Sequence, residues 1–110
     1  MKSTVLASSR SDNRLQLKFV KDQELVRLML KIFEKFHINW ELFQERNEKT
    51  GNIKIISIKN LKDDIFYFED EHLKIDLFIG YKKVIFILYS TEKLQQQILD
   101  EITINSKWKK

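Results

Sequence analysis

The chain has 110 residues, of which 43% are hydrophobic, 12% aromatic and 33% charged, and its formal net charge is +4. This size allows one domain that buries roughly two-thirds of the surface of its unfolded chain, and the composition excludes a disordered protein. Because the chain has no cysteine and no run of about 18 uncharged apolar residues, disulfides, cysteine-ligated zinc and a transmembrane helix are excluded, and we expect a cytoplasmic protein without membrane contact.

The first 13 residues, MKSTVLASSRSDN, are small and polar and follow no period. Such a segment predicts a flexible N-terminal arm over residues 1–13. The run RLQLKFV that follows alternates, with Leu15, Leu17 and Phe19 on one side, and predicts a short strand. We therefore place the single folded domain at residues 14–105, before a basic C-terminal tail at residues 106–110.

A helix is expected over residues 23–36. Asp22 stands at the N-cap position and Glu24 in the first turn, near the positive end of the helix dipole. Two apolar rows then follow at helical spacing: Leu25, Met29, Ile32 and Phe36, and beside them Val26, Leu30 and Phe33. A helix with two apolar rows is expected to be covered on two sides.

Basic residues gather on this helix and at the C-terminus. They are Arg27, Lys31 and Lys35 at four-residue steps, and Lys107 and Lys109 around Trp108. The helix face is interpreted first as a solvated surface. The alternative is that all six residues contact a nucleic acid, the cations at phosphates and the tryptophan stacked on a base.

After His37 the period changes to two, with Ile38, Trp40 and Leu42 facing one way. An isoleucine-rich run at residues 53–58 follows Gly51, so residues 38–58 are expected to form a hairpin. His37 itself follows the last helical turn, where a histidine side chain interacts favourably with the negative end of the helix dipole. Its role is therefore interpreted as structural. A further short strand is predicted for IFYFE, residues 65–69.

The strongest hairpin signal is KIDLFIGYKKVIFILY, in which two apolar strands flank a glycine turn. A two-residue turn would pair Leu77 with Val84, whereas a four-residue loop over residues 80–83 would pair them differently. Either loop leaves the same six side chains on one face: Leu73, Ile75, Leu77, Val84, Phe86 and Leu88. The other face carries Lys74, Asp76 and Phe78 beside Ile85, Ile87 and Tyr89, and it is too apolar to stand uncovered in water.

The last helix is expected to begin at Ser90 or Thr91 as its cap. Its narrow apolar stripe consists of Leu94, Ile98, Leu99 and Ile102, and the side chains expected in solvent are Gln95, Gln96, Gln97, Asp100 and Glu101. The predicted fold class is α+β: a single domain with a mainly antiparallel sheet of about five to six strands, one helix near the N-terminus and one at the C-terminus, in the order β-α-β-meander-α.

Asp76 on an apolar strand, a glycine turn, a second apolar strand and a helix follow one another along the chain. Over residues 22–104 this order resembles the order of elements in restriction-endonuclease-like cores. The resemblance implies a Mg²⁺ ion held by Asp76 and by an acidic residue of the next strand, with a lysine two positions later. The next strand reads VIFILY and carries neither, so we expect no catalytic residue, metal or cofactor.

Other clusters are interpreted as structural. Glu69, Asp70 and Glu71 with His72 lack the glycine and the alternating acids of an EF-hand loop, which favours a solvated turn over a cation site. The serines of the N-terminal segment form no nucleophile elbow, and the two glycines form no phosphate-binding loop. No small-molecule ligand is indicated.

The chain has more apolar surface than one small domain is expected to hide, because both faces of the sheet and both rows of the first helix are apolar. Surplus patches of this kind mark interfaces. We therefore predict a small non-catalytic protein-interaction or regulatory module that pairs as a homodimer or with another protein. The expected interface residues are Phe66, Phe68, Phe78, Ile85, Ile87 and Tyr89. The alternatives are a nucleic-acid-binding protein and, third, a metal-dependent nuclease that uses Asp76.

Overall fold

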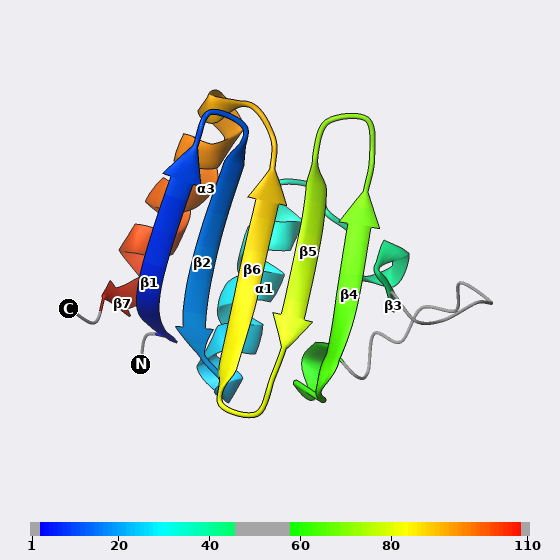
Figure 1. The fold of residues 1–110 in the computed structure, drawn as a ribbon, viewed down its shortest axis with the longest axis vertical. Coiled ribbons are helices and arrows are strands. Elements are labelled where there is room, and N and C mark those ends of the chain that lie inside the picture. Colours follow the sequence, from blue (N-terminus) through cyan, green and yellow to red (C-terminus); the bar gives the residue numbers. More distant parts are fainter. Residues whose placement is uncertain (1–2, 46–57, 109–110) are drawn as a thin grey trace.

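The computed structural model describes residues 3–45 and 58–108. In this part of the chain, seven strands form one sheet in the order β3-β4-β5-β6-β2-β1-β7 (Figure 1). The strands are β1 (Ser3–Ser11), β2 (Arg14–Val20), β3 (Gln44–Glu45), β4 (Asp64–Glu69), β5 (Lys74–Ile79), β6 (Lys83–Tyr89) and β7 (Ser106–Trp108). All neighbours pair antiparallel except β1 and β7, which pair parallel.

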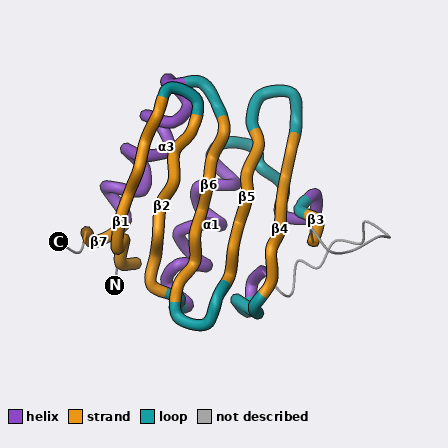
Figure 2. Tube along the Cα trace, in the orientation of Figure 1, coloured by secondary structure: helices purple, strands orange, loops and turns teal. Residues whose placement is uncertain are grey.

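Two α-helices, α1 (Gln23–Lys35) and α3 (Glu92–Asn105), pack on the same face of the sheet, and a short 3-10 helix, η1 (Trp40–Leu42), follows α1 (Figures 1 and 2). Phe33 of α1 stacks on Phe86 of β6 with 6.2 Å between ring centroids, and Arg10 of β1 reaches Gln95 of α3. The chain is thus a single α+β domain with a helix near each end, as predicted, and the five long strands form the antiparallel centre of its sheet.

Local signals explain both ends of α1. The Asp22 carboxylate accepts a hydrogen bond from the Leu25 amide at 2.9 Å, so Asp22 is the N-cap as expected. At the other end, Ile38 N donates to Phe33 O at 2.7 Å and His37 adopts a positive φ of 59°, which is a Schellman ending with histidine where glycine is usual. The helix buries most of both apolar rows, with Leu30 and Phe36 half-buried; its buried residues are Leu25, Val26, Leu28, Met29, Ile32 and Phe33.

The β5–β6 hairpin has the four-residue loop. Ile79 pairs with Val84 and Leu77 with Phe86, and the Gly80 amide donates to the Lys83 carbonyl at 2.9 Å. The six apolar side chains named above share one face, as expected for either loop length, and all six are buried in the core under the helices.

The N-terminal segment differs from the expectation. A flexible arm over residues 1–13 is wrong for Ser3–Ser11, which forms β1 and pairs with both β2 and β7, with Val5 fully buried. The ladder is irregular between Val5 and Ala7, so the alternation that marks a strand is broken within the segment. The tail at Ser106–Trp108 is likewise a strand, paired with β1.

The hairpin expected over residues 38–58 is wrong in its first half. Trp40–Leu42 is a 3-10 helix whose first turn is capped by Asn39 Oδ1, which accepts from the Glu41 amide at 2.9 Å. Trp40 instead packs against Phe33 with 4.8 Å between ring centroids, so tertiary packing overrides the period of two. Residues 53–57 of the second half lie outside the described residues, and Ile58 is buried.

The polar side of α3 is not wholly solvated as expected, because Gln95 and Glu101 are buried. Gln95 contacts Arg10 of β1, a strand that the sequence did not reveal, and Glu101 faces Lys35 of α1. Thr91 is the N-cap of this helix, accepting from the Leu94 amide at 3.3 Å. Within the described ranges, neither helix has the length and apolar character needed to span a bilayer.

Candidate interaction surface on the open sheet face

One face of the sheet carries no helix of the described residues. Both α1 and α3 lie behind the strands in the view of Figure 1, and no described element crosses in front of them. We call this surface the open face and define it by the side chains that alternate with the core side chains on β4, β5, β6, β2 and β1. The burial pattern supports this definition, because the core positions of β2, β5 and β6, together with Phe66 and Phe68 of β4, are buried while most open-face positions are partly or fully exposed.

Strand register arranges the open face in three rows that run across the strands in the order β4, β5, β6, β2, β1. The first row is Ile65, Phe78, Ile85, Lys18 and Ala7. The second row is Tyr67, Asp76, Ile87, Gln16 and Ser9. The third row is Glu69, Lys74, Tyr89, Arg14 and Ser11. Residues adjacent in a row are directly opposite one another, close enough for their side chains to touch.

The open face has an apolar half and a polar half. The apolar half lies on β4, β5 and β6 and consists of Ile65, Tyr67, Phe78, Ile85, Ile87 and Tyr89. The polar half lies on β2 and β1, where the side chains are basic, amide-bearing or small. Ile87 at the centre is 7% exposed, and the other apolar side chains are partly exposed. The hydrophobic effect therefore favours covering the apolar half.

Three of the five charged side chains in these rows lie in the third row, whereas Lys18 lies in the first row and Asp76 in the second. Glu69 on β4 lies directly opposite Lys74 on β5, whose Nζ lies 5.5 Å from the centroid of the Tyr89 ring. Arg14 on β2 donates to Gln16 Oε1 at 2.6 Å. An acidic residue thus stands at one side of the face and a basic residue at the other, three strands away.

The tip of the β5–β6 hairpin adds an aromatic residue at the border of the open face. Tyr81 is 81% exposed, and Lys82 Nζ lies 5.7 Å from its ring centroid. The tip borders a shallow hollow that is lined by Phe78, Gly80, Tyr81, Lys82, Lys83 and Ile85. The apolar half therefore continues onto this hairpin.

Four of the six expected interface residues, Phe78, Ile85, Ile87 and Tyr89, share the open face. The expectation is wrong for Phe66 and Phe68, which are 0% and 3% exposed and point into the core. The residues of the same strand that lie on the open face are Ile65 and Tyr67, which were not among the expected interface residues. The run IFYF is apolar at every position and has no alternation of apolar and polar residues. The sequence pattern therefore does not indicate which side of this strand faces the helices.

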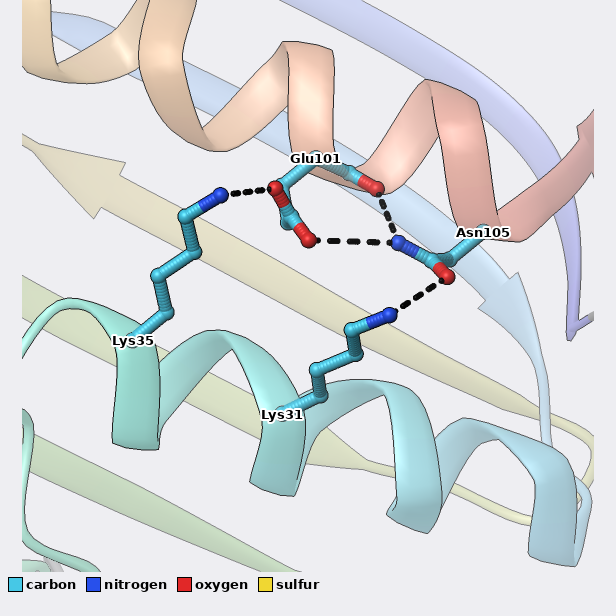
Figure 3. A network of polar contacts seen from close by, with 4 residues as sticks. All are labelled: Lys31, Lys35, Glu101 and Asn105. Atoms are coloured by element: carbon cyan, nitrogen blue, oxygen red, sulfur yellow. Dashed lines mark hydrogen bonds and ion pairs between the residues drawn. The ribbon is translucent and has the colours of Figure 1, made fainter.

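The expected nucleic-acid contacts on α1 lie on the opposite side of the molecule, and two of them connect α1 to α3 (Figure 3). Lys31 donates to Asn105 Oδ1 at 3.1 Å, and Lys35 Nζ lies 2.6 Å from Glu101 Oε2. Arg27 is exposed, with Nη1 3.5 Å from Glu24 Oε1. The structure places Lys107 and Trp108 in β7, and Lys109 lies outside the described residues. Of these six residues, Lys31 and Lys35 are thus engaged in contacts with α3.

The contacts around Glu101 change its acidity. The pKa of its carboxyl lies below the ordinary value, chiefly because Lys35 donates a hydrogen bond to the carboxylate. Burial acts in the opposite direction, while the positive charges of Lys35 and Lys31 lower the pKa further. Lys31 and Lys35 thus serve the contact between the two helices.

The acidic residues do not assemble a metal site in the described part of the chain, where no group of three suitable ligands occurs. Asp76 lies in the second row between Tyr67 and Ile87 and is 6% exposed. In the turn after β4, Asp70 Oδ1 accepts from the His72 and Leu73 amides at 2.8 and 2.9 Å. The Asp70 carboxylate therefore stabilises its own turn.

No family model matches this chain, and no curated protein or solved structure matches it either. The class of the molecule is therefore described by its fold alone, a single α+β domain with both α-helices on one face of an antiparallel sheet. Because unrelated functions share such folds, function has to be argued from the surface.

Proposed function

We propose that the chain is a small non-catalytic protein-interaction module that associates with a second copy through the open face. The observation that supports this proposal is the apolar half of the open face, where aliphatic and aromatic side chains occupy three adjacent strands with no described element over them. Soluble monomers seldom expose a contiguous apolar patch beyond a few hundred Å², and larger patches usually mark interfaces.

The size of the face limits the strength of the association. Five strands spaced by about 4.8 Å, with six residues each rising about 3.4 Å, span roughly 24 by 20 Å, or about 480 Å² before side-chain relief is counted. Two such surfaces bury about 1,000 Å² in total, near the lower limit for a specific interface. We therefore expect a reversible dimer whose population depends on protein concentration.

Light scattering tests the proposal across a concentration series from about 1 to about 200 μM, a range suited to a small interface. The wild-type chain should move from monomer to dimer within this range. Ile85→Lys places a charge in the apolar half and should leave a monomer, because the charge would be desolvated on pairing.

Ile104→Lys is the matched control, since Ile104 on α3 is 65% exposed and lies away from the open face. This variant should dimerise like the wild type. A wild-type chain that stays monomeric throughout, or an Ile85→Lys variant that dimerises normally, would contradict the proposal.

The second candidate function is binding of single-stranded nucleic acid, and a specific observation favours it. Tyr81 is highly exposed between Gly80 and two lysines, Lys82 and Lys83, beside the hollow that Phe78 lines. Aromatic side chains next to cations are the usual platform for unstacked bases. The residues favoured by the structure thus differ from those on α1 and the tail that the sequence indicated.

Titration of a labelled oligonucleotide at increasing salt separates this alternative from the first. If it holds, affinity falls steeply with salt, and replacing Lys82 and Lys83 by Glu weakens binding strongly. Arg27→Glu with Lys93→Glu, two exposed sites on the helices, serves as the control with the same change in charge. No binding at low salt would eliminate the alternative without affecting the first proposal.

A further inference from the structure

We infer that two copies pack with their open faces against each other and are related by a two-fold axis. The axis is parallel to the strands and lies between β5 and β6. In this arrangement, Glu69 of each copy meets Arg14 of the other. This inference rests on the proposed function and adds the geometry of the pair. A symmetric dimer uses the same surface twice, and two flat sheets that pack face to face are about 10 Å apart with strands aligned to within about 30°.

Such an axis places β4 of one copy over β2 of the other, and β5 of one copy over β6 of the other. Each row of one copy then lies over the same row of the second copy. In the third row, Glu69 then meets Arg14, and Lys74 meets the ring of Tyr89. The latter contact repeats one that already exists within the chain, where Lys74 Nζ lies 5.5 Å from that ring. The charged residues of the third row thus meet opposite charge or an aromatic face.

The first row also matches. In the first row, Phe78 meets Ile85 at the centre, and Ile65 meets the aliphatic stem of Lys18. In the second row, Tyr67 meets Gln16 and Asp76 meets Ile87. Asp76 is only 6% exposed within its own chain and therefore presents little polar surface to the second copy. The small side chains of β1 lie at the edge of the contact between the two copies and leave space there.

Several other symmetric arrangements bring like charges together, which costs affinity. An axis over β5 sets Lys74 against its own symmetry mate. An axis over β6 sets Lys74 against Arg14, and an axis across the strands through the second row sets Lys18 against Arg14. An axis between β6 and β2 avoids these conflicts but sets Phe78 against the small Ala7 of the second copy, so that the apolar half finds no large apolar partner.

Charge reversal tests the pairing in a way that simple loss of a contact does not. Glu69→Arg and Arg14→Glu should each weaken the dimer roughly tenfold at low salt, because each creates two like-charge contacts per dimer. The chain carrying both changes should return to within about threefold of the wild-type dissociation constant, since opposite charges meet again. The two residues are three strands apart in one chain, about 14 Å, so the recovery reports contact between copies.

The matched controls are Glu34→Arg and Lys93→Glu, exposed residues of α1 and α3. Neither should change the dissociation constant, because both lie on the helix side of the molecule. Circular dichroism and thermal unfolding establish that each variant is folded before its association is measured by sedimentation equilibrium.

Single cysteines provide a second measurement that does not depend on charge, since the chain has no cysteine of its own. β6 lies about 2.4 Å to the side of the axis and β1 about 12 Å. Ile85→Cys should therefore cross-link between copies with a short bismaleimide, whereas Ser9→Cys on β1 should not.

The outcomes separate the inference from the proposed function. A wild-type dimer that is broken by Ile85→Lys but shows no recovery in the double reversal, or that cross-links through Ser9→Cys instead of Ile85→Cys, would overturn the two-fold arrangement while the proposed function stands. A strictly monomeric wild-type chain would overturn both.

Discussion

Gln95 connects three segments of the fold with one buried side chain. Its Oε1 accepts from Arg10 Nε at 3.2 Å, and its Nε2 donates to the carbonyls of Ser90 and Asp12 at 3.3 and 3.4 Å. A fully buried amide is tolerated only where its polar atoms are paired. The residue therefore holds the start of α3 against the turn between β1 and β2.

Gln95→Ala should lower the free energy of unfolding by about 2 kcal/mol, because Arg10 loses one of its hydrogen-bond partners and two backbone carbonyls lose the Gln95 amide. Gln97→Ala, on the exposed side of the same helix, should change it by less than about 0.5 kcal/mol. Urea denaturation measures both values. Equal effects at the two positions would show that the buried hydrogen bonds do not contribute.

Glu101 makes the stability of the molecule depend on pH. Because Lys35 lowers the folded-state pKa of Glu101 below its ordinary value of 4.5, the contribution of Glu101 is fully present above that value. It is lost as the pH falls through the lower, folded-state pKa. The Lys35 side chain is 57% exposed, so solvent screening keeps the contribution small.

Glu101→Gln should therefore destabilise the protein at pH 7 by up to about 1 kcal/mol, and this difference from the wild type should disappear in acid. The measurement is a series of urea titrations between pH 7 and pH 3. Glu34→Gln, an exposed position on α1, is the control for loss of one negative charge. A difference that persists unchanged at the acid end would argue against the ion pair as its cause.

At the scale of elements, β1 is the feature that most changes the interpretation of the chain. It lies between β2 and β7 and contributes the fully buried Val5 to the core, and it carries Arg10 to α3. Its small polar residues would not form a strand alone. They pair because β2 and β7 present the backbone groups that complete their hydrogen bonds.

Val5→Asp should cost at least about 3 kcal/mol in the free energy of unfolding, because a carboxylate would be buried without a partner. Ala7→Asp, an exposed site two residues further on in the same strand, should cost less than about 1 kcal/mol. Thermal or urea unfolding distinguishes them. A flexible arm, by contrast, would tolerate both substitutions equally.

At the scale of the whole molecule, the sheet and the two α-helices form the two layers of the domain. No described element covers the other side of the sheet. If a second copy provides the missing layer, association and folding are linked, because only the folded chain presents the open face. Ligands that bind only the folded state stabilise it by mass action.

The melting temperature of the wild-type chain should therefore rise with protein concentration, by about 3 °C for each tenfold increase above the dissociation constant of the dimer. Ile85→Lys should show no such dependence, and Ile104→Lys should behave like the wild type. Scanning calorimetry over a hundredfold range of concentration measures the effect. A wild-type melting temperature that does not change with concentration would mean that the open face is not covered by a second copy.

Local signals were sufficient for much of the fold. Asp22 and Thr91 cap the helices because their side-chain oxygens reach amides only three residues away, and the β5–β6 hairpin depends on a loop of four residues. Period and turn chemistry act over such short distances, so they can be read along the chain. They also placed Phe78, Ile85, Ile87 and Tyr89 together on one side of the sheet.

Non-local contacts decided the rest. Phe66 and Phe68 lie in the core, and Ile65 and Tyr67 on the open face, because the register with β5 selects one side of a run that is apolar throughout. The partners of β1, the burial of Gln95 and the choice of one face for both helices likewise depend on segments far apart in the chain. A residue's neighbours along the chain establish its local conformation, but what lies over it is set by packing across the whole domain.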